Sequence, residues 1–203
     1  MIKIEKANLK FNDKIIFNDL NFNINKGEKV IIRAHSGRGK STLLKVIMGF
    51  QRLTSGKVEV EGLELNISNI EKIREKISYL PQSINFRNQT IKEVIENIFS
   101  FKKNKNLKID NEKLMFLIEE LKLEKDILEK KFDFLSGGEK QRVALIIAFL
   151  MDKEIILLDE SIASLDVILK ERVMRYLLQL DKTVILVTHD RGVNVEGYKV
   201  MEI

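Results

Sequence analysis

The chain has no cysteine, a single proline and only two histidines among its 203 residues. The absence of cysteine excludes a disulfide framework and thiolate metal sites, and two histidines argue against a zinc site. One proline and ten glycines also argue against linkers and low-complexity tracts. The composition therefore predicts one large globular domain, or a core domain with an insert, in a reducing compartment.

Long apolar runs are missing as well. The longest, residues 143–151, is far shorter than the ~20 residues that a membrane-spanning helix requires. The N-terminal stretch MIKIEKANLKF alternates apolar and polar residues as a strand does, and it lacks the apolar core of a signal peptide. We therefore expect a chain that does not span a membrane.

Charge of one sign is also scarce. The 35 basic and 30 acidic residues leave a net charge of only +5, and they mix in runs such as EKIREK at 71–76. Mixed runs are typical of solvated helix faces, and the sequence has no basic stripe with interleaved aromatic residues. The charge pattern predicts no nucleic-acid partner.

Apolar periodicity divides the chain into strands that alternate with helices. This order predicts an α/β fold with a mostly parallel sheet covered on both faces, and residues 84–134 read as a helical insert. Thr90 and Glu93 have the spacing of a capping box, which predicts a helix start. The expected strands are 2–11, 15–24, 29–33, 57–61, 77–80, 154–158, 183–187 and 198–203, and the expected helices are 41–50, 70–76, 90–101, 112–130, 139–151 and 167–180.

The stretch AHSGRGKST, residues 34–42, lies between an apolar strand pattern and a helix pattern. Small residues such as Ser36 and Gly37 let a loop curl so that its N–H groups converge on phosphate oxygens. Lys40 would reach the β- and γ-phosphates, and Ser41 would give its hydroxyl to Mg²⁺. The order of strand, loop and helix predicts a phosphate-binding loop.

Ala34 keeps an alternative open, because the common phosphate-loop pattern has glycine at this position. The alternative is an ordinary glycine turn that ends in a surface lysine. Alanine is harmless if its backbone angles are strand-like, whereas a positive φ would cost on the order of 1 kcal/mol.

The run LSGGEKQR, residues 135–142, is a second motif. Ser136 and Glu139 have capping-box spacing, which by itself requires only a helix start. Two adjacent glycines go beyond capping, because they leave bare N–H groups that can bind an anion. The run resembles the signature motif of ATP-binding cassette (ABC) ATPases, and the resemblance extends over essentially the whole chain.

The resemblance implies a P-loop NTPase core with a mostly parallel sheet, an N-terminal antiparallel β subdomain and a helical insert. It implies a single ABC ATPase domain over residues 1–203, with 1–83 and 135–203 as the nucleotide-binding core and 84–134 as the helical subdomain. The implied cofactors are ATP and Mg²⁺, and the implied reaction is hydrolysis of ATP to ADP and phosphate.

Further residues match the family's site. Phe11 matches the aromatic residue that stacks on adenine; alternatively, it points inward from an edge strand. Gln82, in LPQ, matches the glutamine that contacts Mg²⁺ and links the core to the insert; otherwise it is an exposed polar residue after a strand. Asp166, in ASLD, matches the aspartate loop that crosses to a partner subunit, and it also stands where a helix cap is expected.

Two carboxylates and a histidine complete the set. The apolar strand 154–158 ends in Asp159 and Glu160, and buried strands seldom end so without a cation or reacting group; a solvated strand end is the alternative. By resemblance, Asp159 holds Mg²⁺ through water and Glu160 polarises the attacking water as general base. His189, in THD, matches the switch histidine that contacts the γ-phosphate, whereas a lone histidine after a strand is otherwise structural.

The resemblance thus assigns three groups of residues. The catalytic residues are Glu160, His189 and Gln82. The Mg²⁺ ligands are Ser41, Gln82 and Asp159. The nucleotide-binding residues are Phe11, His35, Ser36, Gly37, Arg38, Gly39, Lys40, Ser41, Thr42, Ser136, Gly137, Gly138 and Asp166.

Four positions depart from the family's pattern. Ala34 replaces a glycine, Ser161 stands where proline usually follows the glutamate, ASLD inverts the commoner SALD, and Ile147 occupies a position often filled by arginine. None of them removes a side chain that touches phosphate or metal. The departures therefore bear on rate and partner docking rather than on nucleotide binding.

In such proteins the signature motif is too far from the phosphate loop to reach the same ATP, so a second ABC subunit completes each site. The resemblance implies a homodimer, or a pair with a similar chain, that ATP drives together. We expect a peripheral protein at the cytoplasmic face of the cell membrane that powers a transporter with separately encoded transmembrane subunits. The alternative is a non-transport ABC ATPase that couples ATP to a membrane-anchored complex, as in cell division or lipoprotein release.

Overall fold

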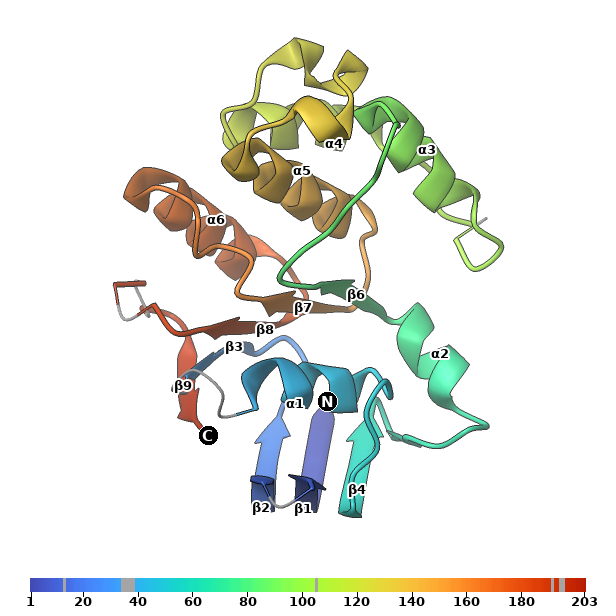
Figure 1. Ribbon diagram of the computed structural model, residues 1–203, viewed down its shortest axis with the longest axis vertical. Coiled ribbons are helices and arrows are strands. Elements are labelled where there is room, and N and C mark those ends of the chain that lie inside the picture. The colour runs from blue at the N-terminus through green and yellow to red at the C-terminus, as the bar shows by residue number, and fades with distance from the viewer. Residues whose placement is uncertain (13, 34–38, 105, 191, 194–195) are drawn as a thin grey trace.

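The computed structural model describes residues 1–12, 14–33, 39–104, 106–190, 192–193 and 196–203 (Figure 1). Within these residues, strands and helices alternate along most of the chain. The elements are β1 (Ile2–Phe11), β2 (Lys14–Ile24), β3 (Lys29–Arg33), α1 (Lys40–Ile47), β4 (Ser55–Val60), β5 (Leu63–Glu64), α2 (Ile70–Glu75), β6 (Ile77–Leu80), α3 (Ile91–Ser100), α4 (Asn111–Glu120), two 3₁₀ turns η1 (Lys125–Glu129) and η2 (Phe132–Phe134), α5 (Gly137–Leu150), β7 (Ile155–Asp159), α6 (Val167–Gln179), β8 (Thr183–Thr188) and β9 (Lys199–Glu202).

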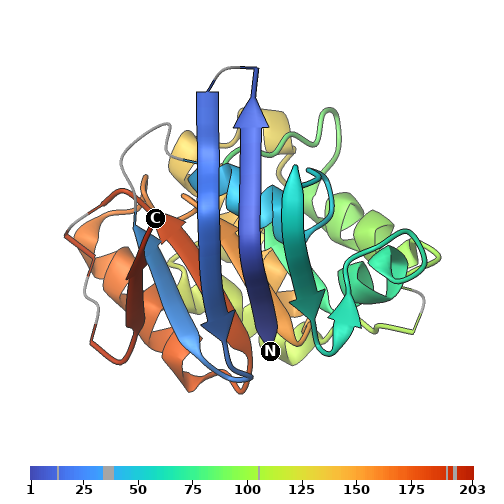
Figure 2. The same ribbon diagram turned by 90° about the horizontal axis from the view of Figure 1, so that it is seen from below.

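The strands form two sheets. The N-terminal sheet has the order β2-β1-β4-β5 and is antiparallel, and the second sheet has the order β6-β7-β8-β3-β9 with parallel pairing throughout. Figure 2 shows the antiparallel strands lying across α1, with the parallel strands behind. The predicted α/β fold, with its antiparallel N-terminal sheet, is confirmed.

The parallel sheet is covered on both faces, as the sequence predicts. Successive side chains of a strand point to opposite faces, and those of β7 accordingly divide between two apolar cores. Ile155 and Leu157 join the core shared with α1 and the antiparallel sheet, whereas Ile156 and Leu158 join the core shared with α5 and α6. This double burial explains why β7 and β8 are apolar runs without alternation.

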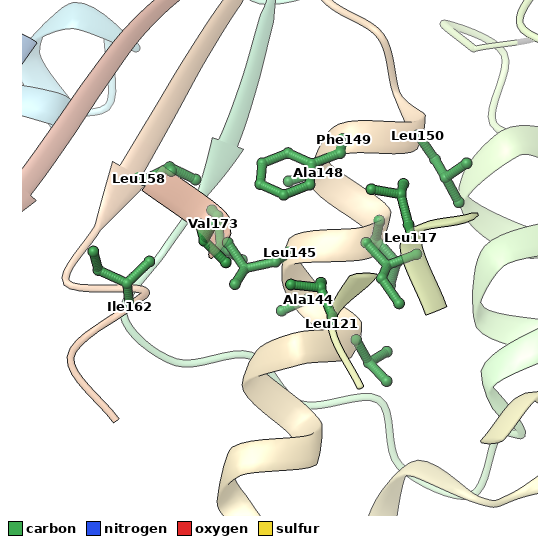
Figure 3. Packing of buried hydrophobic residues seen from close by; sticks show 14 of the residues in the cluster. Leu117, Leu121, Ala144, Leu145, Ala148, Phe149, Leu150, Leu158, Ile162 and Val173 are labelled. Atoms are coloured by element: carbon green, nitrogen blue, oxygen red, sulfur yellow. The ribbon is translucent and has the colours of Figure 1, made fainter. Parts of the chain in front are cut away.

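Helix α5 connects the parallel sheet with the preceding helices. Its apolar residues are buried nearly all round, as the sequence predicts. Figure 3 shows Leu117 of α4 and Leu121, just after this helix, against one side of α5, with Leu158 and Val173 on the other side. The capping box predicted for the start of α3 is also present, because the Thr90 hydroxyl and the Glu93 carboxylate bond each other's N–H groups.

The predicted single helix over 112–130 is wrong. Helix α4 ends at Glu120, and Lys122 takes a left-handed conformation with φ of 51°. The Leu123 N–H then bonds the Ile118 carbonyl at 2.9 Å, and the Lys122 N–H bonds that of Glu119 at 2.9 Å. These bonds form a Schellman motif, which usually has glycine at the left-handed position. Because lysine stands there instead, no glycine marks the helix end, and the leucine spacing alone predicted a longer helix.

The antiparallel sheet contains a close backbone approach at Gly56, in β4. Gly56 has φ of +99°, and a Cβ built there would lie 2.4 Å from the Lys6 carbonyl oxygen and 2.7 Å from the Ala7 Cα. Lys6 is itself left-handed and lies where the pairing of β1 with β4 shifts register. Only glycine fits this bulge without moving a neighbouring strand.

We predict that Gly56→Ala lowers the free energy of unfolding by about 2–4 kcal/mol, because backbone overlap adds to the strain of a positive φ. Gly62→Ala is the matched control: Gly62 has φ of +76° with nothing within 4 Å of its Cβ position. The control should lose only about 1 kcal/mol. Urea unfolding measures both, and equal losses would contradict the predicted overlap.

Candidate functional site

The site lies where neighbouring parallel strands end. β7 pairs with β8, and β8 pairs with β3, so the carboxyl ends of all three strands meet at one edge of the sheet. In open α/β sheets this edge is where ligands bind. β7 ends in Asp159, β8 ends in Thr188 beside His189, and the chain after β3 leads into α1. The predicted residues Ala34, His35, Ser36, Gly37 and Arg38 fall outside the described residues.

The Glu160 carboxylate joins three residues that the sequence predicts for the site. Its Oε1 lies 3.5 Å from the Lys40 Nζ and 3.2 Å from the His189 Nδ1. Its Oε2 accepts a hydrogen bond from the Gln82 Nε2 at 3.3 Å. Three predicted residues from separate parts of the chain therefore meet around the carboxylate of a fourth.

The backbone at Glu160 sets the direction of this side chain. Glu160 has a left-handed φ of 49°, which is uncommon for a residue other than glycine. Its N–H donates to the Val187 carbonyl at 2.9 Å, so the turn after β7 is fixed to β8. Unusual backbone angles of this kind cluster at functional sites.

Asp159 and Ser41 form the second part of the site. The Ser41 hydroxyl donates to the Asp159 Oδ1 at 2.9 Å, and Asp159 is almost completely buried, with 2% of its surface exposed. Burial raises the pKa of Asp159 above its ordinary value, and the hydrogen bond from Ser41 opposes this rise. Site reasoning from the sequence missed Tyr79, whose hydroxyl donates to the Asp159 Oδ2 at 3.4 Å.

These oxygen atoms fit a magnesium ion. Mg²⁺ prefers oxygen ligands and usually binds proteins through one or two carboxylates, with phosphate and water supplying the rest. In the described part of the chain, no group of three or more His, Cys, Asp or Glu side chains could hold a metal. The Ser41 hydroxyl beside one buried carboxylate suits an ion that arrives with a phosphate.

The start of α1 lies against the antiparallel sheet. Gly39 precedes the helix with φ of +91°, and a Cβ there would lie 2.6 Å from the Ile16 Cγ2 of β2. Thr42 follows in the first turn of the helix.

Phe11, at the end of β1, is 44% exposed, so the alternative of an inward-pointing side chain is wrong.

The signature run begins α5. The Glu139 N–H bonds the Ser136 hydroxyl at 3.2 Å, and the Ser136 N–H bonds the Glu139 carboxylate at 2.8 Å, which confirms the capping box. Cβ atoms built at Gly137 and Gly138 would meet nothing within 4 Å. The helix start is thus open, and α5 packs on the opposite face of the parallel sheet from α1 (Figure 1).

Arg142, in the same run, fastens α5 to the end of α4, a role that the spacing did not reveal. Its Nη1 lies 3.2 Å from the Leu121 carbonyl oxygen and 2.9 Å from that of Lys122. The Nε also bonds the Gly138 carbonyl at 3.3 Å. One guanidinium therefore holds the glycine turn and the C-terminus of a neighbouring helix together.

Asp166 caps α6, as one of its two interpretations predicts. Its Oδ1 accepts the Leu169 N–H at 2.9 Å. The next two residues, Val167 and Ile168, are 70% and 57% exposed. Ser161 and Ile147, two of the departures from the family's pattern, are both buried. The Ser161 hydroxyl has no hydrogen-bond partner within the described residues.

Comparison with known proteins identifies the family. The ABC transporter family model matches residues 17–163. The chain is 35% identical to the energy-coupling factor transporter ATP-binding protein EcfA1 of Mycoplasmopsis pulmonis, over 94% of this chain and 74% of the relative. It is 30% identical to the lactococcin-A transport/processing ATP-binding protein LcnC of Lactococcus lactis, over 92% of this chain but only 27% of that longer protein.

Solved structures agree. The dimeric structure of a bacterial ABC transporter cassette superposes with a TM-score of 0.84 at 30% identity, covering 100% of this chain and 94% of the other. A post-hydrolysis state of the same cassette, bound to ADP and phosphate, superposes equally well. Among the residues described, no helix combines the length and apolarity needed to cross a bilayer. The family model, the relative that is 35% identical and the shared fold agree. The chain therefore belongs to the ABC transporter family, as an ATP-binding cassette.

Proposed function

We propose that this chain hydrolyses ATP and thereby powers a membrane transporter. The observation that carries the proposal is the Glu160 cluster, in which the carboxylate contacts Lys40, Gln82 and His189. A general base must lie within reach of a water molecule and be held in one orientation. Three contacts from three separate segments of the chain hold Glu160 in this way.

The roles of the residues follow from their chemistry. Glu160 accepts the proton of the attacking water, and the Lys40 ammonium stabilises negative charge on the β- and γ-phosphates. His189 faces Glu160 through Nδ1, which leaves its Nε2 for the γ-phosphate. Ser41, Asp159 and Gln82 would hold Mg²⁺, which neutralises phosphate charge when it is bound.

We propose that a second subunit completes each site. Ser136, Gly137 and Gly138 form an open helix N-terminus, which suits the phosphates of a nucleotide held by another subunit. The dimeric cassette that resembles this chain supports a homodimer or a pair with a similar chain. Asp166 would contact that partner through its exposed loop, and Phe11 would stack on the adenine.

The partners in the membrane are also a proposal. The chain is similar to energy-coupling factor ATP-binding proteins, whose names place them in transporters. We therefore favour a role in transport over a role in a non-transport complex. This chain would bind separately encoded transmembrane subunits and lie at the cytoplasmic face of the membrane. We also propose the division into a core, 1–83 and 135–203, and a helical subdomain, 84–134.

Glu160→Gln should lower the ATPase turnover by about 10²–10⁴-fold, because the amide cannot act as a base. Nucleotide binding should remain, and MgATP should trap a dimer in size-exclusion chromatography. Glu154→Gln is the control: Glu154 lies just before β7 and forms an exposed ion pair with Lys76 at 3.2 Å. Undiminished turnover in Glu160→Gln would refute the assignment of the base.

Ser136→Asp tests the shared site. Aspartate preserves the helix cap but places a negative charge against the incoming phosphates, so the variant should fold normally and lose ATPase activity. Mixing it with inactive Lys40→Ala should restore part of the activity, since a mixed dimer contains one intact site. Phosphate release measures the recovery. A mixture as inactive as its components would argue that each chain acts alone.

A further inference from the structure

An ion pair links α6 to the loop that carries His189. The Lys170 Nζ lies 2.6 Å from the Asp190 Oδ2. Lys170 belongs to α6, and Asp190 directly follows His189 after the end of β8. Lys170 belongs to none of the motifs that identify the nucleotide site, and Asp190 is the last residue of THD, to which no role has been assigned above.

Asp190 organises the loop around His189. Its N–H donates to the Thr188 Oγ1 at 3.0 Å, and its Oδ1 accepts the Gly192 N–H at 2.8 Å. One carboxylate oxygen thus shapes the loop, while the other binds Lys170. The ammonium of Lys170 is the main reason why the pKa of Asp190 lies below its ordinary value, so the carboxylate remains charged.

The His189 side chain depends on this loop for its position. The ring is 52% exposed, and Glu160 is the residue that it contacts through Nδ1. A half-exposed ring is not fixed by close packing. Its approach to Glu160 therefore depends on the backbone that presents it, and Asp190 is the next residue in that backbone.

The other end of the ion pair lies one helical turn from Asp166. The Lys170 N–H bonds the Asp166 carbonyl at 2.9 Å, and the Asp166 carboxylate caps the same turn at Leu169. Lys170 thus stands between the aspartate loop and the histidine loop. The Lys170–Asp190 ion pair thus joins the first turn of α6 to the loop that carries His189.

We propose that Lys170 is a positioning residue of the ATPase reaction. Its bond to Asp190 holds the His189 loop against the first turn of α6, so that the distance from His189 to Glu160 follows the position of the Asp166 loop. A partner subunit that docks on Asp166 would then set the geometry of the γ-phosphate site. The inference rests on the proposed function, because it assigns a role within that reaction.

The pair is suited to a test because it contributes little to the fold. The side chains of Lys170 and Asp190 are 19% and 26% exposed, and ion pairs so close to water stabilise a protein only slightly. A small misplacement of a catalytic group nevertheless lowers turnover strongly. Loss of activity without loss of stability would therefore mark a positioning role.

Lys170→Met should lower kcat by about 10–100-fold with the KM for ATP and the melting temperature nearly unchanged. Lys170→Arg, which conserves the charge, should retain most of the turnover. Lys113→Met is the matched control, because Lys113 is 22% exposed and pairs with Asp152 at 3.0 Å away from the site. A Lys170→Met enzyme with the kcat of the control would overturn the inference.

Coupling to the partner-facing loop is tested with Asp166→Asn, which keeps the helix cap and removes the charge. If both residues act through one path, the loss in kcat of the double variant Lys170→Met/Asp166→Asn should be smaller than the product of the single losses. Losses that multiply would overturn the coupling.

Wild-type protein without ATPase activity would refute the proposed function itself, whereas active wild type with a normal Lys170→Met enzyme would refute only this inference.

Discussion

The site depends on two adjacent carboxylates at the end of a buried strand and on how the fold directs them to different partners. Asp159 and Glu160 follow one another there; burial is the main cause of the raised pKa of Asp159, and the charge of Glu160 adds to it. The left-handed turn at Glu160 points its side chain toward Lys40, while Asp159 stays with Ser41. The order of the parallel strands makes this separation possible, because it brings α1, β6 and β8 to the same edge.

The phosphate side of the site and the signature run pack on different apolar cores. Lys40 and Ser41 begin a helix whose apolar side chains pack between the two sheets, so the phosphate side of the site rests on that core. The signature run begins α5, which packs on the other face together with α4 and α6. The signature run and the first turn of α1 therefore rest on different apolar cores, which the parallel sheet separates.

Features signalled by local spacing or by the family's motifs were predictable, including the distant residues that meet at Glu160, whereas contacts that no motif records were not. The capping boxes at Thr90 and Ser136 follow from residues three apart, and the apolar strand that ends in Asp159 is evident in the sequence. The site roles of Tyr79 and Arg142 arise only when segments many residues apart are brought together. The end of α4 was missed because a lysine adopts the conformation for which glycine is the usual signal.

The guanidinium of Arg142 has a mechanical consequence. The C-terminal carbonyls of α4 and the glycine turn of α5 share one planar donor group, so the two helices are braced where they meet. An ammonium could not reproduce the same fixed fan of bonds, because it is a compact charge on a flexible stem. Exchanging Arg142 for lysine would therefore weaken the connection between the end of α4 and the start of α5.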